Sequence, residues 1–277
     1  ETDRVTLDGA PAPEKARARV SRFLDLVRDR AGLRQRAEVR TRNDFPTGAG
    51  LASSASGFAA LALAATRAAG LDLPSPALSA LARQGSGSAA RSLHGGYVEM
   101  FHGERPDGED AYAAPVAEAS HLPLEVLVCI THEGPKDTGS TEGMVRSAET
   151  APYWDAWVHT APADLAAMRD AIGRRDLEAV GEITEHSCFK MHALMLASRP
   201  ALLYWNDTTV RLIHRVRELR DAGTPAWVTM DAGPQVKVIT APEHGDDLAA
   251  ALGEVPGVLR LLRTPLGPAV RIVEPTP

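Results

Sequence analysis

A stretch of small and hydroxyl-bearing residues, Pro46–Gly57, has the composition of a phosphate-binding loop. It reads Pro-Thr-Gly-Ala-Gly-Leu-Ala-Ser-Ser-Ala-Ser-Gly and leads into an alanine- and leucine-rich run, Phe58–Ala69, that predicts a helix. The backbone N–H groups and the dipole at a helix N-terminus attract anions, and the hydroxyls of Ser53 and Ser54 add groups for phosphate or Mg²⁺. The alternative is a tightly packed helix start that binds nothing. The stretch is not a Walker A loop, because no Gly-Lys-Ser or Gly-Lys-Thr follows it.

A second small-residue loop, Gly85–Ser92, carries one long cation, Arg91, among serines and alanines. A guanidinium group can hold a carboxylate through two parallel hydrogen bonds, so Arg91 is a candidate for binding an anionic substrate. Ser86, Gly87 and Ser88 would then present hydroxyl and backbone donors to the same molecule. The alternative is a glycine-rich turn with a surface arginine.

Two polar residues in the second half of the chain are further candidates. Asp231 follows a strand-like run in the sequence Asp-Ala-Gly-Pro, where it could orient or deprotonate a hydroxyl group, or could simply cap the turn. Ser140 lies where a helix is expected to begin, as an N-cap, a ligand contact or both. His186 and His192 are six residues apart on a predicted helix, which is not a metal-binding spacing.

The elements that must carry these residues follow from the spacing of apolar side chains. Arg36–Arg42 alternates in polarity and predicts a strand that leads into the first loop. Leu124–Thr131 is a near-continuous apolar run, which is typical of a central strand. Gly103–Glu118 is polar and contains proline and glycine, so we expect an exposed loop there. Asp207 is expected to cap a helix that runs to about Ala222.

The order of the elements predicts an α+β protein. In the second half, strand, helix, strand and strand follow one another, and the β-like runs Gly257–Arg263 and Ala269–Val273 come near the C-terminus. This order suits an arrangement of ferredoxin-like character. We place the boundary near Leu122–Leu124, which predicts domains of residues 1–122 and 123–277.

Composition narrows the class of function. The chain has 277 residues, of which 44% are hydrophobic and 24% charged, as in an ordinary globular protein. Its net charge of −6 argues against nucleic acid as a partner. No apolar run approaches the roughly 18 residues of a membrane-spanning helix, so we expect no membrane partner. Cys129 and Cys188 fall in apolar runs and are expected to be reduced core residues of a cytosolic protein.

Four segments resemble, in the right order, the GHMP kinase superfamily and, within it, the diphosphomevalonate decarboxylase family. Pro46–Ala55 is similar to the superfamily's phosphate loop, Pro-x-x-x-Gly-Leu-x-Ser-Ser-Ala. Gly85–Ser92, followed by two further glycines, is similar to a second family motif. Thr138–Thr141 and Met230–Pro234 match the third and fourth. The resemblance runs from about residue 36 to about residue 240, and more loosely to the end.

The resemblance implies a two-lobed, GHMP-kinase-like α+β fold. Its N-terminal half would be a ribosomal-protein-like nucleotide-binding unit and its C-terminal half ferredoxin-like. The implied activity is that of an ATP-dependent carboxy-lyase of the mevalonate pathway of isoprenoid biosynthesis. It converts mevalonate 5-diphosphate, a small-molecule substrate, to isopentenyl diphosphate, with ADP, phosphate and CO₂ as the other products. ATP and Mg²⁺ are the implied cofactors, and a cytoplasmic homodimer fits the family.

The resemblance also implies roles for the matched residues. Asp231, Arg91 and Ser54 would be catalytic: Asp231 would face the hydroxyl that is phosphorylated, and Arg91 would bind the substrate carboxylate. Ser54 would contact both ATP and Mg²⁺. The remaining contacts would come from the substrate-binding residues Ser86, Gly87, Ser88 and Ser140 and from the ATP-binding residues Pro46, Gly48, Gly50, Leu51, Ala52 and Ser53.

The chain departs from the family pattern in places. Family members carry an N-terminal Lys-Tyr-Trp-Gly-Lys-like stretch that this sequence lacks, so we expect further residues upstream of Glu1. Gln235 stands where the family usually has Asn, and Thr141 where bacterial members often have Arg. Alternatives therefore stay open. One is a related enzyme that acts on mevalonate or mevalonate 5-phosphate, as a 3-kinase or a phosphomevalonate decarboxylase. The other is a catalytically inactive binding protein with the same fold.

Overall fold

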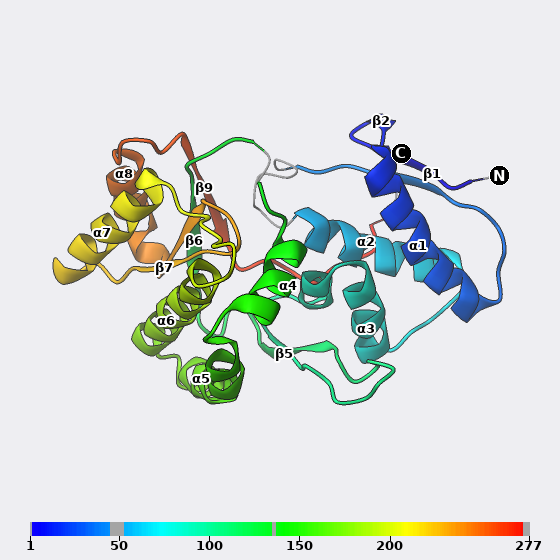
Figure 1. Cartoon of the computed structure of the whole chain (residues 1–277), viewed down its shortest axis with the longest axis horizontal. Coiled ribbons are helices and arrows are strands. Elements are labelled where there is room, and N and C mark those ends of the chain that lie inside the picture. Colours follow the sequence, from blue (N-terminus) through cyan, green and yellow to red (C-terminus); the bar gives the residue numbers. More distant parts are fainter. Residues whose placement is uncertain (1, 45–52, 135–136, 274–277) are drawn as a thin grey trace. The chain divides into compact units, whose positions relative to one another are not determined.

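The structure is a computed structural model that describes residues 2–44, 53–134 and 137–273 (Figure 1). These residues form two compact units. The first contains the described residues up to Glu118 and those from Pro268 onward, and the second contains the described residues of Ala119–Gly267. Part of the predicted ATP-binding set lies outside the described residues, namely Pro46, Gly48, Gly50, Leu51 and Ala52.

The first unit combines a small sheet with several helices. β1 (Arg4–Leu7) pairs antiparallel with β2 (Ala10–Pro11) and parallel with β3 (Glu38–Thr41). α1 (Glu14–Ala31) ends at Gly32, whose φ of 64° is a left-handed conformation that glycine adopts without strain. The other elements are α2 (Ser53–Ala68), α3 (Ser75–Gly85), the 3₁₀ helix η1 (Gly87–Leu93), and the antiparallel strands β4 (Tyr97–Met100) and β5 (Ala113–Ala117).

The core of the first unit forms where α1, α2, α3 and η1 meet. Phe23 of α1 packs edge-on against Phe58 of α2, with ring centroids 5.5 Å apart. Ala59 and Ala62 of α2 are fully buried in the same cluster with Leu81 of α3. Because alanine side chains are short, they let the neighbouring helix approach closely, and the start of α2 lies beside Ser86, directly after α3.

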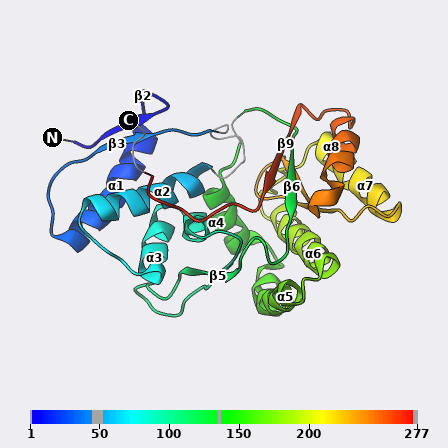
Figure 2. The same cartoon turned by 180° about the vertical axis from the view of Figure 1, so that it is seen from behind.

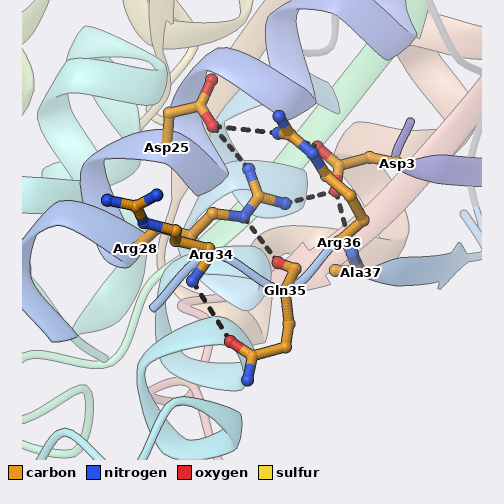
Figure 3. A network of polar contacts seen from close by, with 7 residues as sticks. All are labelled: Asp3, Asp25, Arg28, Arg34, Gln35, Arg36 and Ala37. Carbon is orange, nitrogen blue, oxygen red and sulfur yellow. Dashed lines mark hydrogen bonds and ion pairs between the residues drawn. The ribbon is translucent and has the colours of Figure 1, made fainter. Parts of the chain in front are cut away.

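A network of buried and exposed charges ties the N-terminus of this unit together (Figure 3). The carboxylate of Asp3 accepts hydrogen bonds from Arg28 and from the backbone N–H of Ala37, the latter at 2.8 Å. Arg28 also donates to Asp25 at 2.6 Å and to the backbone carbonyl of Gln35 at 2.9 Å. The network therefore joins β1, α1 and the start of β3.

The second unit is built on an antiparallel sheet with the strand order β7-β8-β6-β9. Figure 2 shows β9 beside β6, in agreement with their pairing. The strands are β6 (Glu125–Ile130), β7 (Trp227–Thr229), β8 (Val236–Thr240) and β9 (Arg260–Pro265). The helices are α4 (Ser140–Thr150), α5 (Trp154–Arg174), α6 (Leu177–Leu196), α7 (Asp207–Asp221), η2 (Pro242–His244) and α8 (Gly245–Gly253).

This sheet carries the core of the second unit. Leu127, Val236 and Val238 of the two central strands are fully buried against Leu212 of α7 and Leu248 of α8. The apolar run that predicts a central strand therefore does form one, β6. Of the helices that the structure describes, none combines the length and apolar character that crossing a membrane would require.

Several local expectations were wrong. The predicted loop Gly85–Ser92 is instead the end of α3 followed by η1, because buried Ala89 and Ala90 pack into the core of the first unit. The predicted exposed loop over Gly103–Glu118 contains β5, which pairs with β4. The run Ala269–Val273 forms no strand in the part of the chain that the structure describes.

Two helix starts also differ from the sequence prediction. Ser53 and Ser54 already lie within α2, whereas the apolar run suggested a helix from residue 58. α7 is capped by Asn206 rather than by Asp207, since the Asn206 side chain accepts from the backbone N–H of Thr209 at 2.8 Å. Asparagine caps a helix as well as aspartate does, so the two neighbours could not be told apart by residue type.

Candidate active site

Ser54 and Ser86 lie side by side in the first unit. Ser54 is in the first turn of α2, and Ser86 lies between α3 and η1. Their hydroxyl oxygens are 3.2 Å apart, which is a hydrogen-bonding distance. Residues from the two predicted anion-binding segments therefore meet at the N-terminus of one helix, where backbone N–H groups and hydroxyls can act on the same anion.

Contacts around Gly85 hold this pair in place. Arg19 of α1 donates two hydrogen bonds to the Gly85 carbonyl, at 2.7 and 3.1 Å, and its guanidinium lies 4.7 Å from the centre of the Phe58 ring. A Cβ atom on Gly85 would come within 2.2 Å of that ring. Glycine is therefore required where α3 ends against α2, one residue before Ser86.

Arg91 projects from η1 and is exposed. Its carbonyl accepts from the His94 N–H at 3.0 Å, but its guanidinium forms no hydrogen bond or ion pair with a side chain or backbone group of the described residues. The helix that carries it is anchored through Ser79, whose hydroxyl donates to the Ala90 carbonyl at 3.1 Å and accepts from the Ala113 N–H at 2.8 Å. Within the described part of the chain, the Arg91 guanidinium is therefore available to bind a carboxylate, and its backbone is held in place by Ser79.

Ser88 and Gly87 are on the same short helix as Arg91. Gly87 is exposed, and a Cβ atom there would meet no described atom within 4 Å. Ser88 is partly exposed, and its carbonyl accepts from the Ser92 hydroxyl at 3.4 Å. The substrate-binding candidates of the first unit, Ser86, Gly87, Ser88 and Arg91, therefore lie within one short stretch that begins just before η1.

Asp231 lies in the second unit, in the turn between β7 and β8. Its side chain is 46% exposed and forms an ion pair with Lys237 of β8, whose side chain is 16% exposed. The turn is closed by a hydrogen bond from the Gly233 N–H to the Asp231 carbonyl, at 2.7 Å. The carboxylate therefore reaches solvent while a neighbouring cation restricts its direction.

Buried side chains of α6 support the strand end before Asp231. The Met230 N–H donates to the Cys188 sulfur at 3.1 Å. His192 is only 2% exposed, and its ring lies 5.1 Å from that of Trp205. Burial lowers the pKa of His192 to about 4, although a hydrogen bond with the Met230 backbone and the charge of Asp231 oppose the shift. The imidazole is therefore neutral at neutral pH and packs under the turn.

Ser140 is the first residue of α4 and is exposed. The residue that precedes the helix is Gly139, so Ser140 is not itself the N-cap. Tyr204 fixes this helix start, because its hydroxyl donates to the Thr138 carbonyl at 3.2 Å. Ser140 is thus at the N-terminus of a helix whose backbone is fixed by Tyr204. The dipole at a helix N-terminus favours contact with an anion.

The predicted site residues fall into two groups. Ser53, Ser54, Ser86, Gly87, Ser88 and Arg91 belong to the first unit, and Ser140 and Asp231 to the second. Sequence reasoning missed Lys237. The available signal was a lone lysine in the apolar strand Val-Lys-Val-Ile-Thr, six residues after the candidate aspartate.

Comparisons with known proteins identify the family. A model of the diphosphomevalonate decarboxylase-like N-terminal domain matches residues 1–113, and one of the mevalonate 5-diphosphate decarboxylase C-terminal domain matches residues 126–258. Diphosphomevalonate decarboxylase of Candida albicans is 35% identical over 252 residues, covering 83% of this chain and 69% of the relative. The chain belongs to the diphosphomevalonate decarboxylase family.

Other members of the family give the extent of the match. The Ganoderma lucidum diphosphomevalonate decarboxylase is 41% identical over 214 residues, which cover 74% of this chain and 54% of that protein. The human one is 39% identical over 221 residues, covering 78% and 54%. The chain therefore spans about half the length of these curated relatives.

Solved structures match most of the chain. Mevalonate diphosphate decarboxylase from Staphylococcus aureus has a TM-score of 0.93 at 33% identity, covering 99% of this chain and 82% of that one. The complex of MDDEF with MVAPP, AMPPCP and magnesium has a TM-score of 0.91 at 36% identity, covering 99% and 84%. The predicted GHMP-kinase-like α+β fold is confirmed. The roles of the individual site residues in this chain stay predictions.

Proposed function

We propose that the protein catalyses the ATP-dependent decarboxylation of mevalonate 5-diphosphate to isopentenyl diphosphate, in the mevalonate pathway. The observation that carries the proposal is its match, over 99% of its length, to the MDDEF complex with MVAPP, AMPPCP and magnesium. AMPPCP is an ATP analogue and MVAPP is mevalonate diphosphate. The reaction would begin with transfer of a phosphoryl group to the 3-hydroxyl of the substrate.

Asp231 would orient that hydroxyl and accept its proton as the oxygen attacks phosphorus. Phosphoryl transfer depends on positioning and on neutralising charge more than on covalent chemistry from the protein. The ion pair with Lys237 supports this role, because it restricts the carboxylate and offsets its charge beside anionic phosphates. The neutral His192 below the turn adds no further charge.

Arg91 would hold the substrate carboxylate until it leaves as CO₂. In that step the bond between the carboxylate carbon and C2 breaks, and its electron pair forms the C2–C3 double bond. The bond between C3 and the new phosphate breaks at the same stage, and phosphate departs with that electron pair. Phosphate is a far better leaving group than hydroxide, which is why phosphorylation comes first. Ser86, Gly87, Ser88 and Ser140 would bind the diphosphate end of the substrate.

The residues at the start of α2 are suited to binding a nucleotide whose phosphates already carry a metal ion. Among the described residues, no group of three or more His, Cys, Asp or Glu side chains could hold a metal ion. The donors present are hydroxyls and backbone N–H groups, and Mg²⁺ commonly takes few protein ligands together with substrate phosphates. Ser53 and Ser54 would bind the phosphates of ATP, with Ser54 also on Mg²⁺. When bound, the ion neutralises charge on the transferred group.

The location, the oligomeric state and the partners of the protein are inferred from the family. We infer a cytoplasmic homodimer that acts on a small molecule, with neither nucleic acid nor a membrane as partner. The net charge of −6 supports the inference about nucleic acid. Size-exclusion chromatography with light scattering tests the dimer, and a monomer at micromolar concentration would contradict it.

A substrate panel tests the reaction. The protein is incubated with ATP, Mg²⁺ and either mevalonate, mevalonate 5-phosphate or mevalonate 5-diphosphate, and ADP and CO₂ are both measured. We expect equal amounts of ADP and CO₂ with the 5-diphosphate only. ADP without CO₂ would indicate a 3-kinase, and CO₂ from the monophosphate a phosphomevalonate decarboxylase. Nucleotide binding with no product from any substrate would indicate an inactive member of the family.

A further inference from the structure

Gln235 follows the Asp231 turn directly and is almost completely buried, at 1% exposure. Its side-chain oxygen accepts a hydrogen bond from the backbone N–H of Thr131 at 2.7 Å. Its side-chain nitrogen donates to the backbone carbonyl of His132, also at 2.7 Å. One amide group therefore satisfies both a donor and an acceptor of the segment that follows β6, 103–104 residues away in sequence.

Further hydrogen bonds reach the same place. The Thr131 hydroxyl donates to the Pro234 carbonyl at 3.1 Å, and the Thr209 hydroxyl donates to the same carbonyl at 3.0 Å. Asn206, the N-cap of α7, donates to the Thr131 hydroxyl at 3.2 Å. The last residue of the Asp-Ala-Gly-Pro turn is thus held both by the end of β6 and by the start of α7.

Gln235 lies just before β8, where the pairing of β6 with β8 ends at Cys129 and Val236. On one side of this point, the chain leads back from Gln235 through the turn to Asp231. On the other side, Thr131 and His132 follow β6. The side chain of Gln235 takes the place of a backbone partner here, because it bonds the backbone of both Thr131 and His132.

We propose that Gln235 is a positioning residue that holds the Asp231 turn against Thr131 and His132, directly after β6. This inference rests on the proposed function, in which Asp231 faces the reacting hydroxyl. Catalytic groups lose much of their effect when displaced by about 1 Å, so loss of these hydrogen bonds should weaken that role.

The test compares Gln235→Leu with Gln235→Asn and with Thr240→Val in the full chain. Leucine fills similar volume but removes both hydrogen bonds, whereas asparagine keeps the amide group. Thr240 is the matched control, because it is fully buried at the end of β8, the strand that Gln235 precedes, and its hydroxyl donates to the Pro225 carbonyl, before the start of β7. The control removes a comparable hydrogen bond at the opposite end of the hairpin.

We expect Gln235→Leu to lower kcat by about tenfold or more, while KM for mevalonate 5-diphosphate and KM for ATP both stay within about twofold. Gln235→Asn should recover part of the loss. Thr240→Val should lower Tm without these kinetic changes. If Gln235→Leu loses as much Tm as Thr240→Val and keeps its kinetic constants within about twofold, Gln235 is only structural and the proposal fails.

A measurement that does not depend on turnover separates this proposal from the proposed function. Hydrogen exchange of the full chain should be faster at the Thr131 amide and around Asp231–Pro234 in Gln235→Leu than in the wild type, and unchanged there in Thr240→Val. Absence of activity in the wild-type protein would overturn the proposed function alone. Unchanged exchange at both segments would overturn the tie through Gln235.

Discussion

Lys237 forms an ion pair with Asp231 across the β7–β8 hairpin. The two meet because Lys237 pairs with Thr229 in the antiparallel register, and Asp231 follows two residues after Thr229. The lysine side chain is mostly buried, whereas nearly half of the aspartate side chain faces solvent. The positive charge of Lys237 therefore lies beside the accessible carboxylate of Asp231. This charge lowers the electrostatic repulsion between that carboxylate and an approaching phosphate.

Replacing Asp231 by asparagine should abolish most of the activity. Asparagine keeps the size of the side chain but removes the basic oxygen, and losses of a general base are typically about 10² to 10⁴-fold. We expect kcat for mevalonate 5-diphosphate to fall on that scale while both KM values change little. Steady-state kinetics of Asp231→Asn measures this, with Asp221→Asn, at the exposed end of α7, as control. Retention of kcat within a few-fold would make Asp231 a turn residue.

Replacing Lys237 by methionine should leave the fold intact and weaken catalysis. The variant keeps the buried length of the side chain but loses a charge-assisted hydrogen bond, so we expect kcat to fall about tenfold and KM for ATP to rise. Lys237→Arg should retain most of the activity. The control is Lys190→Met, which breaks a similar ion pair with Asp164 (2.5 Å) in the same unit. Equal kinetics of the two methionine variants would remove Lys237 from the mechanism.

Replacing Ser54 by alanine should weaken the use of ATP. Its hydroxyl lies beside that of Ser86 at the start of α2, where the nucleotide phosphates are expected, so we expect KM for ATP to rise and kcat to fall. Ser56→Ala is a close control, because Ser56 is exposed on the same helix and donates to the local carbonyl of Ser53, at 3.2 Å. Identical ATP kinetics in the two variants would count against a role for Ser54.

Replacing Arg91 by lysine should already be damaging. Lysine keeps the charge but loses the planar fork that holds a carboxylate through two hydrogen bonds. We expect kcat/KM for mevalonate 5-diphosphate to fall at least about tenfold, the scale of one charge-assisted hydrogen bond, with unchanged Tm because Arg91 is exposed. Arg67→Lys, at an exposed ion pair with Asp72, is the control. Near-full activity of Arg91→Lys would reduce its role to that of a local charge.

The buried contact of Asp3 with Arg28 should contribute stability that depends on pH. Burial raises the pKa of Asp3, but hydrogen bonds from the Ala37 N–H, Ser21 and Arg28 outweigh it, so the pKa is lowered. A lowered pKa in the folded state means that this stability is present above the unfolded value, about 3.9, and is lost as pH falls through the folded pKa.

The substitution Asp3→Asn should therefore be costly at neutral pH. Breaking this pair leaves Arg28 without its buried charge partner, and breaking a buried pair costs roughly 3–5 kcal/mol. Asp25→Asn removes the exposed partner of the same arginine and should cost no more than about 1 kcal/mol. Urea unfolding at pH 7 and pH 3 measures both. The difference between wild type and Asp3→Asn should shrink at pH 3, and a difference that stays constant would contradict the assignment.

Much of the fold could be predicted from the residues because it depends on local pattern. The apolar run Leu124–Thr131 predicted a central strand, and β6 (Glu125–Ile130) is one. Aspartate is a favoured N-cap residue, and the side chain of Asp176, just before α6, accepts from the Ala179 N–H. β5 escaped prediction because its sequence, Ala-Ala-Pro-Val-Ala, has no alternation, and pairing with β4 makes it a strand. The residue types also indicated which positions could bind phosphate or carboxylate.

Only the tertiary structure decided which of those residues meet. Ser54 and Ser86 are hydrogen-bonded although 32 positions separate them, because α2 and α3 pack against each other through alanines and Gly85. Lys237 reaches Asp231 through the register of a hairpin, and Gln235 reaches Thr131 across 104 positions. Contacts of this kind depend on how whole elements pack, and the free energy of that packing is spread over many side chains. Local sequence therefore identified the chemical groups, and packing determined their partners.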